Sequence, residues 1–183
     1  MALRIHGQRA LKTLPGLATR PTPARVREAI FNIWQGRIEG CRWLDICSGS
    51  GAMGAEALCR GAKIVMAIDQ SPRACQVIRA NWQGLCGPEQ EIQIIRGDVR
   101  HSLSRLDEKT VDFIYFDPPY DSDLYQPVIT EIFQGNFLAP GGEMAVECRT
   151  GQVPTMEAMT DRYHFHCRQK SYGSTTLLLL QKM

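Results

Sequence analysis

Short apolar runs alternate with helical patterns along most of the chain. The predicted strands span 42–47, 64–68, 91–95, 111–116 and 142–148, with a closing pair at 163–169 and 175–181. The helices predicted between them span 51–60, 72–82, 99–106 and 124–133. Strands that alternate with helices form a mostly parallel sheet covered on both faces. We therefore expect an α/β protein with a doubly wound, mostly parallel, seven-stranded Rossmann-like sheet and a C-terminal antiparallel hairpin.

The N-terminal part has a different pattern. Residues 1–21 are predicted to form a basic arm that is extended and poorly packed. Residues 22–183 are predicted to form a single domain, which opens with a helix over about 22–35. Thr22 is expected to cap this helix, with a proline in its first turn. Arg25 and Arg27 fall off the apolar stripe of the helix, so we expect them to face solvent or a ligand.

Positive charge is concentrated near the N-terminus. Residues 1–42 contain eight basic and two acidic side chains (8 − 2 = +6), whereas the remainder contains 13 basic and 17 acidic ones (13 − 17 = −4). This asymmetry indicates a polyanionic partner held at one end of the molecule. Seven of the eight basic residues are arginines, which favours bidentate contact with phosphate. A solvated helix face with incidental arginines is the alternative interpretation.

Composition excludes several classes of protein. No apolar run approaches the ~18 residues of a membrane span, and the first residues lack the apolar core of a signal peptide. The seven cysteines form no CxxC pair, so they predict neither a zinc site nor a disulfide framework. We expect a cytoplasmic protein with reduced thiols, no metal and no membrane association. Its small size and single core favour a monomer.

The stretch Asp117-Pro118-Pro119-Tyr120 is the strongest chemical signal. Two consecutive prolines end the apolar strand before them, so the aspartate is expected at the carboxyl end of that strand. Open α/β sheets bind their ligands at this edge. An acceptor, a stiff turn and an aromatic ring together suit a flat ring that bears an amino group. The alternative interpretation is purely structural: a proline-rich turn that begins with an acidic residue.

A glycine-rich turn follows the first strand of the predicted sheet. Gly49, Gly51 and Gly54 spell GxGxxG, a pattern that is weak by itself because it serves any cofactor that approaches the backbone closely. Three carboxylates accompany it at successive strand ends: Asp45, Asp69 and Asp98. Singly, each of these acids could be a helix cap. Together with the DPPY stretch, they favour S-adenosylmethionine over a nicotinamide cofactor.

These motifs resemble those of class I, S-adenosylmethionine-dependent methyltransferases with a DPPY motif. More specifically, the chain is similar to the bacterial family that methylates the N2 amino group of a guanine in 16S (small-subunit) ribosomal RNA. The matching segments are 20–22, 25–32, 44–45, 49–52, 54, 56–58, 60–62, 117–120 and 172–173. The arginine-rich segment 20–32 is the more specific part of the match, because DPPY and the glycine turn identify only the superfamily.

The charge asymmetry, the strand-end motifs and the resemblance together predict three sets of functional residues. The catalytic set is Asp117, Pro118, Pro119 and Tyr120. The set for S-adenosylmethionine is Arg20, Asp45, Gly49, Ser50, Gly51, Asp69, Gln70, Asp98 and Val99. The set for RNA is Arg4, Arg9, Lys12, Arg25 and Arg27. The implied partner is small-subunit ribosomal RNA, either bare or within an assembling small subunit.

Other functions remain open from the residues alone. DPPY also suits methylation of adenine N6 or cytosine N4 in DNA, or of a protein amide. An NAD-dependent oxidoreductase would use the GxGxxG pattern but has no evident use for DPPY. A non-catalytic RNA-binding module with the same fold is disfavoured, because Asp117, Tyr120 and the glycine turn are all intact.

Overall fold

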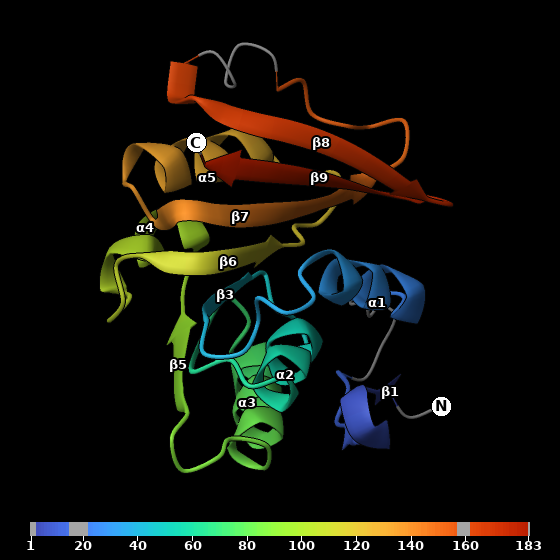
Figure 1. Ribbon diagram of the computed structural model, residues 1–183, viewed down its shortest axis with the longest axis vertical. Coiled ribbons are helices and arrows are strands. Elements are labelled where there is room, and N and C mark those ends of the chain that lie inside the picture. Colours follow the sequence, from blue (N-terminus) through green and yellow to red (C-terminus); the bar gives the residue numbers. More distant parts are fainter. Residues whose placement is uncertain (1–2, 15–21, 157–161, 183) are drawn as a thin grey trace.

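One sheet of seven strands forms the body of the protein, whose computed structural model describes residues 3–14, 22–156 and 162–182. Its strands are β3 (Arg42–Ile46), β4 (Ile64–Asp69), β5 (Glu91–Arg96), β6 (Val111–Phe116), β7 (Leu138–Arg149), β8 (Phe165–Tyr172) and β9 (Thr175–Lys182). Their order across the sheet is β5-β4-β3-β6-β7-β9-β8 (Figure 1).

The strands from β5 to β7 run parallel to their neighbours, and β9 runs antiparallel between β7 and β8. The predicted seven-stranded, mostly parallel sheet with a C-terminal antiparallel hairpin is confirmed. From β3 the chain first builds β4 and β5 on one side, and later adds β6 on the other side. The strand order therefore reverses between β3 and β6, which is where open α/β sheets place their ligands.

Helices cover both faces of this sheet. Those on one face are α1 (Ala24–Ile33), α2 (Ala52–Cys59) and α3 (Pro72–Gln83), and those on the other are α4 (Val99–Ser102) and α5 (Tyr125–Gln134). Side chains alternate along each strand, so Trp43 of β3 packs with the first group, whereas Leu44 and Ile46 pack with the second. Within the described ranges, no helix combines the length and apolarity needed to cross a membrane.

Two predicted helices differ in detail from the observed ones. Helix α1 begins at Ala24 with Pro23 at its cap position, and no side chain caps it. The prediction that Thr22 caps this helix is therefore wrong. The hydroxyl of Thr22 interacts instead with the phenol of Tyr115. The helix predicted at 99–106 is α4 followed by a short 3-10 turn, η2 (Leu103–Arg105).

The N-terminal segment, residues 3–14, packs against α2 and α3. It consists of β1 (Leu3–Arg4), η1 (His6–Gln8) and β2 (Ala10–Leu11). The side chains of Ile5 and Leu11 are buried, and a backbone N–H of η1 donates to Glu56 at 3.0 Å. The backbone of Lys12 exchanges two hydrogen bonds with the side chain of Asn81, at 2.9 and 3.0 Å. The prediction of an extended, poorly packed arm is wrong here, because buried apolar and backbone groups fix this segment; residues 15–21 lie outside the described residues.

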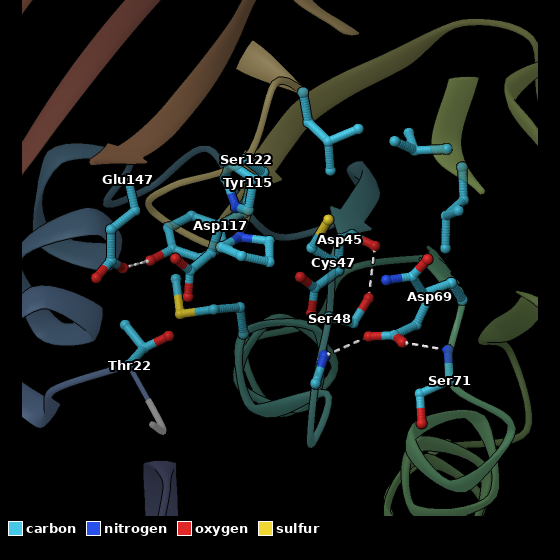
Figure 2. Close-up of a pocket in the computed structure, with 18 of the residues that line it drawn as sticks. Thr22, Asp45, Cys47, Ser48, Asp69, Ser71, Tyr115, Asp117, Ser122 and Glu147 are labelled. Atoms are coloured by element: carbon cyan, nitrogen blue, oxygen red, sulfur yellow. Dashed lines mark hydrogen bonds between the residues drawn. The ribbon is translucent and has the colours of Figure 1, made fainter. Parts of the chain in front are cut away.

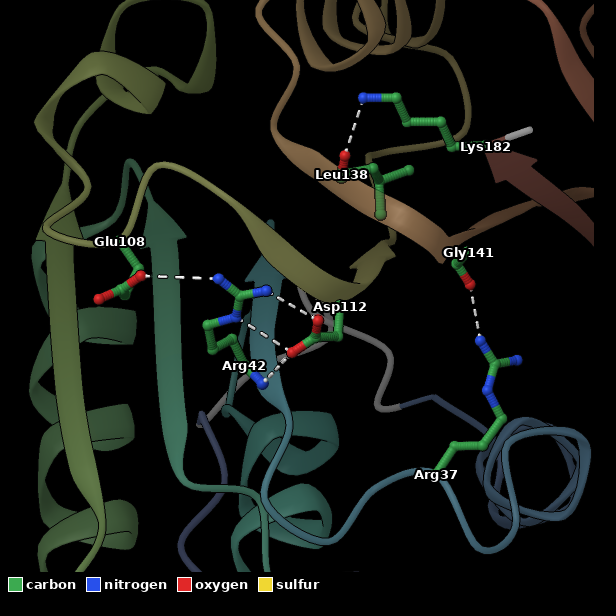
Figure 3. A network of polar contacts seen from close by, with 7 residues as sticks. All are labelled: Arg37, Arg42, Glu108, Asp112, Leu138, Gly141 and Lys182. Carbon is green, nitrogen blue, oxygen red and sulfur yellow. Dashed lines mark hydrogen bonds and ion pairs between the residues drawn. The ribbon is translucent and has the colours of Figure 1, made fainter.

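Ion pairs join β3 to β6 at the edge of the sheet where these strands begin (Figure 3). The side chain of Arg42 donates to both carboxylate oxygens of Asp112, at 2.9 and 3.1 Å, and its backbone N–H donates to the same group at 2.8 Å. Glu108 lies 3.8 Å from the same guanidinium. Burial would raise the pKa of Asp112, but the hydrogen bonds from Arg42 outweigh burial and lower that pKa. The carboxylate of Asp112 is therefore held in its ionised form by Arg42 at this edge of the sheet.

Candidate active site

A cleft of about 930 Å³ lies beyond the carboxyl ends of β3, β4, β5 and β6, where the strand order reverses. This volume is in the range typical of small-molecule sites, ~300–1,000 Å³. Figure 2 shows side chains from several of these strand ends turned toward the same space. The structure brings together the following predicted residues in the lining: Asp45, Gly49, Ser50, Asp69, Gln70, Asp98, Val99, Asp117, Pro118, Pro119 and Tyr120.

The turn after β3 presents its backbone to the cleft. Cys47 and Gly49 both have left-handed backbone angles, with φ of 61° and 56°. This conformation is unusual for a cysteine, and it is held in part by the hydrogen bond from the Cys47 N–H to the Ile68 carbonyl at 2.9 Å. A Cβ added at Gly49 would meet no atom within 4 Å. The backbone at Gly49 is therefore open to close approach by a ligand.

The other two glycines of the GxGxxG pattern make room for a tryptophan. A Cβ at Gly51 would lie 2.8 Å from the indole nitrogen of Trp82, and a Cβ at Gly54 would lie 2.1 Å from the same ring. The Trp82 indole also donates to the Gly51 carbonyl at 2.8 Å. Gly51 was expected among the cofactor-binding residues, but the structure places it outside the cleft lining, against Trp82. Trp82 was not anticipated from the sequence.

Two carboxyl groups hold the glycine turn in place. The carboxylate of Asp69 accepts the N–H groups of Gly49 and Ser71 at 2.9 and 2.8 Å (Figure 2). Asp45 is buried and accepts the N–H of Gly54 at 3.1 Å. Burial raises the pKa of both carboxyl groups, and for Asp45 the nearby Asp69 adds to the increase. Both acids therefore shape the turn that a cofactor would contact.

Asp98 has a different environment from the other carboxylates of the cleft. It caps α4 by accepting the backbone N–H of Arg100 at 3.0 Å, and the guanidinium of Arg100 also binds its carboxylate at 2.6 Å. Hydrogen bonds from Arg100 lower the pKa of Asp98. Asp98 is therefore an ionised acceptor at the rim of the cleft.

Asp117 stands at the carboxyl end of β6. Its backbone N–H donates to the Ile46 carbonyl at 3.3 Å, which ties the residue to β3. Burial first, and then the charges of Glu147 and Asp45, raise the pKa of the Asp117 carboxyl well above its usual range. A strongly perturbed acid inside a cleft is a candidate for chemistry rather than for structure alone.

Three tyrosines surround Glu147, a buried residue of β7 that the sequence analysis missed. The phenols of Tyr115 and Tyr120 donate to its two carboxylate oxygens, the second at 3.2 Å. The phenol of Tyr125 donates to its backbone carbonyl at 3.2 Å. The available signal was one acid within the apolar run 144–148. This network positions Tyr120 beside Asp117.

Arg149 follows Glu147 on the same face of β7 and covers part of the Tyr120 ring. The centre of its guanidinium lies 5.2 Å from the ring centroid. Arg149 thus covers one face of the Tyr120 ring, so a planar ligand in the cleft would have to stack on the other face.

Charge in the cleft is strongly one-sided. The lining contains seven carboxyl side chains and two arginines, and one of the arginines, Arg100, is already bonded to Asp98. Such a site favours a cationic ligand and a partner that donates N–H groups. Thr13 and Leu14 also reach the lining from the N-terminal segment, a contribution that the sequence did not reveal.

The residues predicted to bind RNA lie outside the cleft lining. Arg4, Arg9, Lys12 and Arg25 are exposed. The expectation that Arg27 faces solvent or a ligand is wrong, because it is only 4% exposed and lies 3.4 Å from the Glu56 carboxylate. A buried arginine beside a buried carboxylate is a structural ion pair. Arg20, predicted to bind the cofactor, lies outside the described residues.

Comparison with known proteins gives consistent matches over nearly the whole chain. The family described as "Conserved hypothetical protein 95" matches residues 3–181. The Bacillus subtilis protein named "Putative rRNA methyltransferase YlbH" is 31% identical over 95% of this chain and 94% of its own length. Ribosomal RNA small subunit methyltransferase D of Escherichia coli is 30% identical over 92% of this chain and 81% of its own length.

A solved structure has the same architecture. The Escherichia coli protein titled "Putative methyltransferase yhhF" superposes with a TM-score of 0.79 at 28% identity, covering 100% of this chain and 98% of its own. The solved structure and the sequence matches therefore agree that the chain has a methyltransferase fold.

Proposed function

Because the chain belongs to the Conserved hypothetical protein 95 family, we propose that it methylates the N2 amino group of a guanine in 16S (small-subunit) ribosomal RNA, with S-adenosylmethionine as methyl donor. The observation that carries this proposal is Asp117, an acid with a raised pKa that lines the cleft between the glycine turn and Tyr120. The names of two relatives, which include rRNA methyltransferase activity, support the choice of substrate.

The residues of the cleft fit the proposed cofactor. Gly49 offers an open backbone, and Asp69 and Asp98 offer carboxylate oxygens at the ends of neighbouring strands. The excess of carboxyl groups suits a cation. When bound, S-adenosylmethionine supplies an electrophilic methyl group on a positively charged sulfur. Ser50, Gln70 and Val99 complete the set that would hold it; Gly51 would act only by supporting the turn.

Asp117 and Pro118 would fix the amino group that is methylated. An exocyclic amino nitrogen is a weak nucleophile, because its lone pair is delocalised into the ring. We expect the Asp117 carboxylate and the Pro118 carbonyl to accept its two N–H bonds and to aim the lone pair. Tyr120, held by Glu147, would stack on the base with the ring face that Arg149 leaves open. Alignment of this kind can supply a large part of the rate increase.

The Asp117 carboxylate can also stabilise the positive charge that develops on the amino nitrogen. Methylation places positive charge on the amino group, which must then release a proton. The Asp117 carboxylate would offset that charge and accept the proton at one of its oxygens. A raised pKa makes this carboxylate a better base than an ordinary aspartate. No covalent bond between protein and substrate is required, so no catalytic cysteine is expected.

The protein must also bind the RNA backbone and give the target base access to the cleft. A base within a duplex must be flipped out to reach such a cleft. Arg4, Arg9, Lys12 and Arg25 would contact phosphates without reading sequence. We place these contacts on a basic N-terminal part, residues 1–21, and on the start of the domain, residues 22–183. The proposed partner is small-subunit RNA or an assembling small subunit, bound by a cytoplasmic monomer.

The proposal is tested by methyl transfer from labelled S-adenosylmethionine to small-subunit RNA. The RNA is offered bare and in particles from cells that lack this gene, and labelled nucleosides are identified by mass spectrometry. Label on N2 of one guanine, absent with the Asp117→Ala variant, is the expected result. An enzyme that binds S-adenosylmethionine but labels neither form of RNA would overturn the RNA assignment and direct the search to DNA bases or protein amides.

A further inference from the structure

The outermost strand, β8, carries a row of cations on one of its faces. His166, Arg168 and Lys170 are two positions apart and exposed, so they project from the same side of the strand. Arg168 already forms an ion pair, since it donates to the buried carboxylate of Glu143. Even so, 52% of its side chain is exposed. Lys170 forms no ion pair with any carboxylate in the described part of the chain.

Strand register places this row on the face of the sheet that carries Glu147. Lys170 pairs with Leu177, and Leu177 pairs with Glu147. Directly paired residues project from the same face of a sheet. Neighbouring strands lie about 4.8 Å apart, so roughly 10 Å separates Lys170 from Glu147 across β9. The cations of β8 are thus close to the group that orients Tyr120.

Two arginines continue the row toward the cleft. A Cβ added at Gly173, in the turn between β8 and β9, would lie 2.3 Å from Nη2 of Arg25, so the guanidinium occupies the space beside that turn. Arg149, which pairs with Thr175 in β9, lies over Tyr120 at the cleft. Neither arginine has a carboxylate within ion-pair distance among the residues that the structure describes.

We propose that Arg149, Arg25 and Lys170, here called the hairpin strip, bind the phosphate backbone of the RNA next to the target base. This inference rests on the proposed function and extends it, because it carries the phosphate contact from Arg25 along the β8–β9 turn to Arg149 and Lys170. Cations that no carboxylate of the protein neutralises can bind phosphate and displace the counterions condensed on the RNA. Arg149 lies over the Tyr120 ring, which is expected to stack on the target base. The backbone of the RNA strand that carries this base can therefore reach the hairpin strip.

The test compares two double variants of the full chain. Arg25→Gln with Lys170→Gln removes two charges from the hairpin strip. Lys63→Gln with Arg79→Gln removes two exposed charges from other elements and is the matched control. Binding to a small-subunit RNA fragment is measured by fluorescence anisotropy over a range of salt concentrations. S-adenosylmethionine affinity and the melting temperature serve as checks on folding.

The hairpin variant should bind RNA at least 10-fold more weakly at low salt. Its plot of log affinity against log salt should be shallower by about 1.4, since each phosphate contact to a single strand contributes ~0.7 to the slope. The control should match the wild type in both quantities. A hairpin variant indistinguishable from the control would overturn the hairpin strip, as would wild-type protein that binds RNA without salt dependence. Absence of guanine methylation with these binding differences intact would contradict the proposed reaction while leaving the hairpin strip standing.

Discussion

The two ends of β6 carry aspartates in opposite electrostatic environments. Asp112, near the start of the strand, is bonded by Arg42, and its pKa is lowered. Asp117, just past the other end, lies in a cleft rich in carboxyl groups, and burial raises its pKa. The same residue type, five positions apart, thus favours the charged form at one end and the protonated form at the other.

This contrast separates a stabilising charge from a reactive one. A carboxylate satisfied by a guanidinium contributes to folding and has little capacity to bind anything else. A carboxyl group held without a cation keeps its acceptor oxygens for a ligand, at some cost in stability. If the two ends of β6 divide these tasks, changes at Asp117 should affect methyl transfer and changes at Asp112 should affect folding.

The largest effect is expected from Asp117→Ala. Methyl transfer should fall by about 10³-fold, because the amino group loses an acceptor and the developing charge loses its counter-charge. S-adenosylmethionine should still bind, as measured by calorimetry, and the melting temperature should not decrease. Loss of cofactor binding would instead make Asp117 a part of the cofactor pocket and would remove the contrast with Asp112.

The pH dependence of the methyl-transfer rate distinguishes the role of the negative charge of Asp117 from the role of its side-chain size. With the wild type, the methyl-transfer rate should rise with pH as Asp117 loses its proton. This rise should lie above the ordinary aspartate pKa of ~3.9, since the folded pKa is raised. Asp117→Asn keeps one acceptor oxygen, so we expect a lower rate without this acid limb. The same limb in both proteins would assign it to another group.

Changes at Tyr120 should have smaller effects. Tyr120→Ala should reduce the rate by roughly 10- to 100-fold, because stacking on a base is worth ~1–3 kcal/mol. Tyr120→Phe keeps the ring but loses the hydrogen bond to Glu147, so its loss should be only a few-fold. Single-turnover kinetics at saturating RNA would measure both. Equal losses for the two variants would assign the role to the phenol rather than to the ring.

The smallest effect on the reaction, but a clear one on folding, is expected from Asp112→Asn. The free energy of unfolding should fall by about 1 kcal/mol, because a charge-assisted pair that is one-third exposed becomes a neutral contact. Methyl transfer should be unchanged. Asp112 has a lowered pKa, so its contribution is present above the ordinary carboxyl pKa of ~3.9 and is lost as pH falls through the lowered value. Urea unfolding at neutral and acidic pH would show the difference between the two proteins shrinking in acid.

The sequence predicted the sheet and the strand-end carboxylates because these depend on local patterns. Apolar runs that alternate with helical spacing define the strands, and the double proline ends β6 at Asp117. The errors came from tertiary contacts. Arg27 looked free on its own helix, but Glu56 of another helix buries it.

The residues that sequence reasoning missed have the same physical origin. Gly51 matched a ligand-binding pattern, yet its small size accommodates Trp82, which lies 31 residues further along the chain. Glu147 looked like part of an ordinary strand, and only the packed sheet brings its carboxylate to Tyr115 and Tyr120. Long-range partners of this kind leave no local periodicity in the sequence.

The position of β8 at the end of the sheet has a further consequence for how molecules of this protein meet. Among the described residues, β8 pairs only with β9, so its outer backbone groups are available to the strand of another molecule. Lysine and arginine along such an edge discourage that addition, because two like-charged edges repel each other. We therefore expect Lys170 and Arg168 also to discourage aggregation through β8. A variant with both residues replaced by neutral ones should self-associate at concentrations where the unaltered protein remains monomeric.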